Sequence, residues 1–259
     1  MAAYEAGRRI FKSKVYSDFT ITCNGATFPA HRAIMCTQSP FFERACNIGL
    51  DETKSGVINL PDDDPAVLEK FLSILYMGNY EDIFYARVEQ PHDVALLTSK
   101  EVEKRIDGGY PLYSNKNCDK NDCKMMQIAN GLREEDSDQF HYKLFQSLRD
   151  ALYIFIMADK FFVPSAQLIA MERFYMNLEL LLDWYNMAEH VLEELIEIID
   201  ELYTNTIPSK PPHDMLRRTL CNFLKRQCRR CPELGVKILQ AATEVLRAHL
   251  DFARDMSGN

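Results

Sequence analysis

Long apolar runs are missing from this 259-residue sequence, as is any excess of basic charge. No stretch reaches the roughly 20 apolar residues that a membrane-spanning helix needs, so a membrane protein is not expected. Lysine and arginine together number 30 against 38 aspartates and glutamates, which leaves a formal charge of −8. Because nucleic-acid-binding proteins normally carry a basic field, direct nucleic-acid binding is not expected either.

Signals for export and for catalysis are also missing. Residues 1–14 lack the apolar core of a signal peptide, and no Asn-x-Ser/Thr glycosylation sequon occurs. We therefore expect an intracellular protein, in the cytoplasm or the nucleus, whose 8 cysteines stay largely reduced. Glycine-rich phosphate loops, Gly-x-Ser-x-Gly elbows and His-Glu-x-x-His helices are absent. The sequence thus predicts a protein that is not an enzyme and that needs no cofactor.

The sequence does contain strong local signals in its first part. Residues Ser17–Cys23 alternate apolar and polar side chains, and Asn24-Gly25 and Ala26–Ala30 follow them, which predicts a β-hairpin. Helical spacing begins after His31, and Ser39-Pro40 is typical of a second helix start.

A short strand and an amphipathic helix come next. Val57–Leu60 reads as the strand, and Asp62–Asp64 precede a helix whose apolar face runs from Val67 to Tyr76 and ends at Gly78. The three carboxylates could also suggest a metal site, but a helix start favours negative charge and accounts for them.

Helical patterns dominate the rest of the chain after a polar stretch. Residues 81–143 show no sustained period and are interpreted as a long polar insert forming a mobile loop. Helices are predicted on both sides of Val163-Pro164-Ser165, then over Asn186–Tyr203, after an Asp214 cap, and once more after Pro232.

The order of these elements, together with several motifs, resembles the BTB/POZ family. The matching stretches are Ser17-Asp18-Phe-Thr-Ile, Phe28-Pro-Ala-His31-Arg32, Ser39-Pro-Phe-Phe42, Gly56-Val-Ile-Asn-Leu-Pro61, Leu75-Tyr-Met-Gly-Asn-Tyr80 and Ala158-Asp-Lys-Phe161. The resemblance implies a mainly helical α/β fold, in which a small sheet with helical hairpins is followed by additional C-terminal helices. It also implies a protein–protein interaction module.

The resemblance also suggests a domain organisation. We expect a BTB/POZ domain over residues 1–175, interrupted by the insert at 81–143, and a helical extension over 176–259. This arrangement is similar to the single-BTB-domain proteins of filamentous fungi.

Two sites follow from the resemblance. Asp18 and Arg32 match a charged pair at the dimer centre of many BTB regulators, and the alternative is a salt bridge within one protomer. Leu50-Asp51-Glu52 is similar to the apolar-x-acidic tripeptide with which BTB adaptors bind a cullin, and the alternative is an incidental match in a solvated loop. Because Gly7 interrupts the short N-terminal segment, we expect the swapped helix of BTB dimers to be weak or absent.

These sites leave two functions open. One is a substrate adaptor for a cullin-based ubiquitin ligase, whose client binds the C-terminal helices or the insert. The other is a self-associating nuclear scaffold linked to transcription, without a ubiquitin-ligase role. Both require protein partners, and a homodimer is compatible with either.

Other polar residues have structural interpretations. His31 lacks a nearby nucleophile or second ligand, so a buried histidine at a helix start is favoured over a catalytic one. Cys228-x-x-Cys231 is half of a zinc signature, and Cys221 does not complete it at a known spacing, so no metal is expected. Basic residues in 217–230 are predicted to pair with the acidic face of the Asn186–Tyr203 helix.

Overall fold

The structure is a computed structural model that describes residues 2–47, 55–82, 137–181, 189–210 and 212–257. The chain divides into two compact units, one formed by residues 1–96 and 153–170, the other by residues 97–152 and 171–259. The expected division at residue 175 stays a prediction. No helix in the described ranges is sufficiently long and apolar to cross a membrane.

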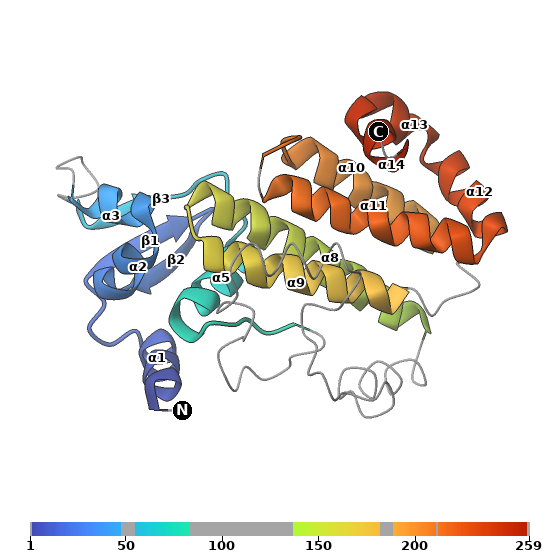
Figure 1. Ribbon diagram of the computed structural model, residues 1–259. Helices are drawn as coiled ribbons and strands as arrows, with labels where there is room; N and C mark the ends of the chain where they lie inside the picture. Colours follow the sequence, from blue (N-terminus) through green and yellow to red (C-terminus); the bar gives the residue numbers. More distant parts are fainter. Residues whose placement is uncertain (1, 48–54, 83–136, 182–188, 211, 258–259) are drawn as a thin grey trace. The chain divides into compact units, whose positions relative to one another are not determined.

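A three-stranded sheet forms one side of the first unit (Figure 1). Strands β1 (Phe19–Cys23) and β2 (Ala26–Ala30) pair antiparallel, and β3 (Val57–Asn59) pairs with β1 in parallel. The predicted hairpin is confirmed, since both residues of the Asn24-Gly25 turn have positive φ, 43° and 84°. Alternate residues of β1 are buried, which places one face of the sheet against the core.

Two short helices, α2 (Arg32–Gln38) and α3 (Pro40–Asn47), form the helical hairpin after the sheet. Ser39 lies between them, and its hydroxyl accepts a hydrogen bond from the Phe42 N–H at 3.2 Å and donates one to the Phe161 carbonyl at 2.6 Å. Phe42 and Phe71 each pack on Phe161, with ring centroids 5.0 and 5.4 Å apart. This aromatic cluster is the centre of the first unit's core.

Helix α5 (Pro65–Met77) begins and ends as its sequence predicts. The Asp64 carboxylate accepts hydrogen bonds from the N–H groups of Ala66 and Val67, at 2.7 and 3.0 Å. Asp63 pairs instead with Lys160, at 2.6 Å. Helix capping therefore accounts for Asp64 and an ion pair for Asp63. Gly78 ends the helix in the left-handed conformation with φ 71°.

The N-terminal segment forms a helix, whereas the expectation that the swapped helix of a dimer is weak or absent stays a prediction. Helix α1 (Ala2–Ser13) is present and packs on α5. At Gly7 a Cβ atom would lie 2.3 Å from the Tyr76 carbonyl oxygen, so only glycine lets the two backbones approach this closely. Gly7 weakens α1 as an isolated helix, but it permits α1 to dock on α5.

Helices α8 (Ser137–Lys160) and α9 (Pro164–Leu181) confirm the predicted break at Val163-Pro164. Helix α8 begins within the range assigned to the insert, because Phe140 and His141 are buried in register with Leu144. The rest of the insert, residues 83–136, lies outside the described residues.

Five further helices lie in the described part of the second unit: α10 (Glu189–Asn205), α11 (His213–Arg230), α12 (Pro232–Ala241), α13 (Thr243–Ala248) and α14 (Leu250–Ser257). Figure 1 shows α10 and α11 side by side. The sequence predicted one helix after Pro232, but there are three. Helix α11 begins at His213 after Pro212, so Asp214 lies in the first turn and is not the cap. The predicted fold class, a small sheet with helical hairpins followed by additional helices, is confirmed.

Candidate partner-binding surfaces

The predicted pair Asp18 and Arg32 meets at the start of α2. The Asp18 carboxylate accepts a hydrogen bond from the backbone N–H of Arg32 at 2.8 Å. The N-cap residue His31 makes no side-chain cap bond, so Asp18 satisfies one of the free N–H groups at the helix start. Arg32 Nε is buried and has no hydrogen-bond partner within the part of the chain that the structure describes. The contact within the protomer is therefore to the backbone of Arg32, not to its guanidinium group.

His31 has structural partners at both ring nitrogens. Nδ1 lies 2.7 Å from the Tyr76 hydroxyl, and Nε2 lies 2.8 Å from the Val15 carbonyl oxygen. Since a carbonyl only accepts, Nε2 carries the proton, and Nδ1 accepts from Tyr76. The Tyr76 oxygen in turn accepts from the His31 backbone N–H at 3.0 Å, and burial raises the pKa of Tyr76 to about 12. The predicted buried, structural histidine is confirmed.

The cullin-type tripeptide, with Leu50 and Glu52, lies outside the described residues. Before it, α3 ends at Asn47, and after it the Ser55 hydroxyl accepts a hydrogen bond from the Val57 N–H at 3.2 Å. Gly56, with φ 67°, then accepts a hydrogen bond from the Thr20 N–H at 2.9 Å through its carbonyl. The segment is thus joined to the helical hairpin on one side and to the sheet on the other.

The acidic face of α10 is occupied by a helix other than the predicted one. Three carboxylates surround the Arg149 guanidinium of α8 at 2.7, 2.6 and 3.2 Å, those of Glu194, Glu197 and Glu201. Burial alone would lower the pKa of Arg149, but hydrogen bonds to and charges of Glu194 and Glu201 outweigh it and raise this pKa. Of these three carboxylates, Glu197 belongs to the acidic face predicted from the sequence, and for it the prediction of pairing with the basic residues of α11 is wrong.

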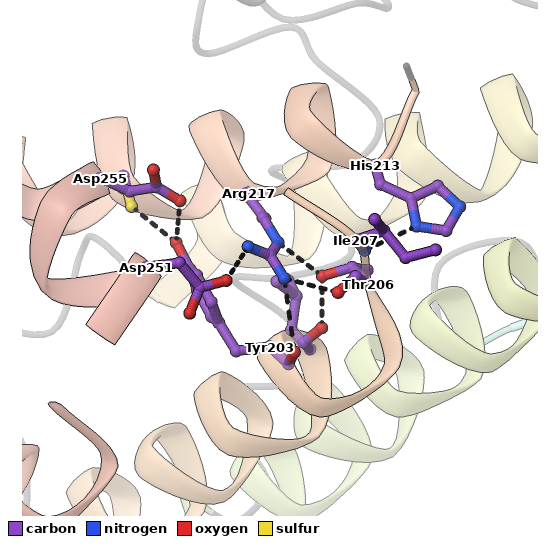
Figure 2. A network of polar contacts seen from close by, with 9 residues as sticks. Tyr203, Thr206, Ile207, His213, Arg217, Asp251 and Asp255 are labelled. Atoms are coloured by element: carbon purple, nitrogen blue, oxygen red, sulfur yellow. Dashed lines mark hydrogen bonds and ion pairs between the residues drawn. The ribbon is translucent and has the colours of Figure 1, made fainter. Parts of the chain in front are cut away.

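Arg217 was predicted to lie on a basic face that pairs with the acidic face of the Asn186–Tyr203 helix. It is buried, with 2% of its area exposed, and its guanidinium group lies among groups from the end of α10 and from α14 (Figure 2). Its guanidinium donates to Thr206 Oγ1 at 2.8 Å and to the carbonyl oxygens of Thr206 and Tyr203, at 2.5 and 3.4 Å. It also forms an ion pair with Asp251 of α14. A cation therefore satisfies carbonyl groups at the C-terminal end of α10, where the helix dipole favours positive charge.

Tyr203 connects the same network to the end of α14 (Figure 2). Its hydroxyl donates to the Asp255 carboxylate at 2.8 Å and lies 3.3 Å from the Cys221 sulfur. Burial, followed by the neighbouring Cys221 and Asp255, raises the pKa of Tyr203 far above its ordinary value. Lys225 of α11 donates to the Asp255 carbonyl oxygen at 2.7 Å. The sequence contains one signal for this network: Asp251 and Asp255 are four residues apart on the last helix.

The three cysteines in the described part of the second unit, Cys221, Cys228 and Cys231, are free thiols. Gly235 of α12 packs on Cys228, where a Cβ atom would lie 3.0 Å from the Cys228 Cα. Among the described residues there is no group of three or more histidine, cysteine or acidic side chains that could hold a metal ion. Cys118 and Cys123 lie outside the described residues.

Comparison with known proteins gives a consistent result. The BTB/POZ domain family model matches residues 8–99. Kelch-like protein 25 of Rattus norvegicus is 23% identical over 252 residues, covering 91% of this chain and 40% of that protein. Kelch-like protein 41 of Mus musculus is 29% identical over 140 residues, covering 51% and 23%. Kelch repeat and BTB domain-containing protein 2 of Pongo abelii is 26% identical over 94 residues, covering 36% and 15%. The chain thus spans less than half the length of each relative.

The family match and the fold of the first unit agree. The match begins in α1 and includes the hairpin, the α2–α3 pair, the parallel third strand and α5, which are the elements that the sequence motifs predicted in this order. The narrower resemblance to fungal single-BTB-domain proteins stays a prediction. The chain carries a BTB/POZ domain, similar to those of the Kelch-like proteins.

Proposed function

We propose that this protein is a BTB/POZ adaptor that binds a cullin scaffold through Leu50 and Glu52 and thereby recruits a ubiquitin ligase. A protein-interaction role is the function that the BTB/POZ domain and the Kelch-like relatives support. The observation that carries the finer proposal is the tripeptide Leu50-Asp51-Glu52, placed between α3 and β3 of that domain. Cullin-binding BTB adaptors resemble this chain in having an apolar-x-acidic tripeptide at that position.

The flanking geometry supports this assignment. The tripeptide follows a helix that the buried Phe42 and Cys46 hold in the core, and it precedes a strand paired with β1. A segment anchored at both ends presents a short motif at a lower entropy cost than a free one. Leu50 would supply apolar contact to a groove on the partner, and Glu52 would hold the segment in its binding conformation.

A homodimer is the second part of the proposal. Asp18, Arg32 and the part of α1 from residue 8 onward belong to the family-matched region, and Val15 and Tyr16, which follow α1, are 49% and 89% exposed. The buried Arg32 Nε–H would donate a hydrogen bond to a carboxylate of a second protomer. Light scattering should detect a dimer at tens of micromolar, roughly where weak association begins, and a strict monomer there would remove this part.

Calorimetry with a purified cullin N-terminal domain tests the adaptor role. Burial of the Leu50 side chain in a partner groove is worth about 1.5–3 kcal/mol, so Leu50→Ala should weaken binding about tenfold or more. Glu52→Ala should also weaken binding, while Asp51→Ala is the matched control at the middle position. No binding by the unmodified chain would refute the adaptor role. A sharp fall in melting temperature for Leu50→Ala would show instead that Leu50 is a core residue.

A further inference from the structure

A groove of about 520 Å³ lies between α1 and α5 in the first unit. Its lining residues come from both helices and from the turns that follow them: Arg8, Phe11, Lys12, Lys14, Ala66, Glu69, Lys70, Ser73, Met77 and Glu81.

The charge of the groove is opposite to that of the whole chain. Four of its lining residues are basic and two are acidic, whereas the chain as a whole carries −8. Arg8 and Lys12 lie four residues apart on α1, so their side chains project from the same side of that helix. The groove therefore concentrates positive charge along one wall, and such a wall attracts anionic groups from solution.

Lys14 shows that part of this charge is withdrawn from water. Its ammonium nitrogen lies 4.2 Å from the centroid of the Phe11 ring. Burial lowers the pKa of Lys14, although the charge of Glu69 opposes that effect. An ammonium group that has lost hydration gains more from a nearby anion than a fully exposed one does.

The floor of the groove is apolar and its walls are held in place. Phe11 packs on Tyr76, with ring centroids 5.1 Å apart, and Met77 is largely buried. The close approach of Gly7 to the Tyr76 carbonyl holds α1 against α5. A ligand would therefore find a preformed site, which reduces the entropy cost of binding.

We propose that this groove binds an acidic peptide segment of a partner protein, with carboxylates along the basic wall and an aliphatic side chain over Phe11. The apolar floor suits such a side chain and offers little to a phosphate backbone. Glu69 and Glu81 interrupt the basic lining, and they would repel a continuous polyanion such as a nucleic acid. An acidic peptide can instead place neutral residues beside these two carboxylates.

Fluorescence anisotropy on the full chain at low salt tests the proposal. The probe is a short fluorescein-labelled peptide of glutamates interspersed with leucines, and its matched control has glutamine at every glutamate. We expect the acidic peptide to bind and the neutral peptide to bind far more weakly. Lys12→Glu should weaken binding about tenfold, because it replaces an attraction by a repulsion. Lys237→Glu, an equal charge change at an exposed position of α12, should leave binding unchanged.

Several results would overturn the proposal. Equal affinity of Lys12→Glu and Lys237→Glu would place binding outside the groove, and equal affinity of the two peptides would remove the role of charge. If the acidic peptide does not bind at about 1 mM, the weak end of specific association, the groove is not a binding site for it. If a single-stranded oligonucleotide binds more tightly than the acidic peptide, and Lys12→Glu weakens that binding, the ligand of the groove is a nucleic acid and not an acidic peptide. Circular dichroism of both variants checks that these exposed substitutions leave the fold intact.

Discussion

Replacing Arg217 by methionine should destabilise the second unit more than any exposed charge substitution. Methionine keeps an apolar stem of similar length, so the change removes mainly the guanidinium group. That group holds the end of α10 and the ion pair to Asp251 of α14. Without it, carbonyl groups of Tyr203 and Thr206 lose a donor that lies in the protein interior.

The expected cost follows from burial. Removing one partner of a buried ion pair costs about 3–5 kcal/mol, and the Arg217 side chain is only 2% exposed. The Asp251 side chain is 23% exposed, so water can solvate the freed carboxylate and reduce the loss. We therefore expect about 3 kcal/mol, at the lower end of that range. The matched control is Arg247→Met, whose pair with Glu244 has side chains 72% and 82% exposed and is worth about 0–1 kcal/mol.

Urea unfolding of the full chain, followed by circular dichroism, measures this difference. Hydrogen exchange should show that the amides of α14 lose protection first, because this helix loses its ion pair to α11. The double variant with Asp251→Asn should cost less than the two single changes added together, since they share one interaction. If Arg217→Met costs no more than Arg247→Met, the network does not stabilise the fold, and the reasoning from burial is refuted.

Three further predictions concern the first unit. Gly7→Ala should destabilise the docking of α1 by about 1–3 kcal/mol, because the added Cβ would lie 2.3 Å from the Tyr76 carbonyl oxygen. Helix propensity alone predicts the opposite, a rise in melting temperature, and such a rise would contradict this contact. Ser39→Ala should lower the free energy of unfolding in urea by about 1–2 kcal/mol, because the buried Phe161 carbonyl loses its hydrogen-bond donor. The control Ser257→Ala, at an exposed position, should change it by less than about 0.5 kcal/mol. The pKa of Tyr76 is raised from 10.0 to about 12, so its contribution to stability is complete below pH 10 and is lost as pH rises toward 12. Unfolding midpoints from about pH 8 to about pH 11 should therefore fall less steeply in Tyr76→Phe, and equal slopes would refute this assignment.

Local chemistry determined most of the first unit. The Asn24-Gly25 turn, the Asp64 cap and the Ser39 helix start were all predicted from their own residues and neighbours within a few positions. Such signals are visible in a sequence because the groups that satisfy each other are two to four residues apart. The order of these elements was sufficient to indicate the BTB/POZ fold.

The candidate sites were predicted less completely. The sequence paired Asp18 with Arg32, but the structure shows that the carboxylate bonds to the backbone of Arg32, while the contact across a two-fold axis stays a prediction. The groove between α1 and α5 was not predicted, because Gly7 was interpreted as a residue that weakens a helix. Gly7 permits the close approach of α1 to α5 because it lies next to the Tyr76 carbonyl, and Tyr76 is far from Gly7 in the sequence.

The arrangement of the C-terminal helices was decided by tertiary structure alone. From the sequence, Arg217 belongs to a basic face of α11 that pairs with the acidic face of the Asn186–Tyr203 helix, and an isolated arginine is almost never buried. It is buried here because carbonyl groups from the end of α10 and a carboxylate 34 residues further along the chain meet at its guanidinium group. Charge and periodicity in the sequence identify which side chains need polar partners. Only the tertiary structure decides which groups become those partners, because the positions of groups far apart in the chain depend on the packing of every helix between them.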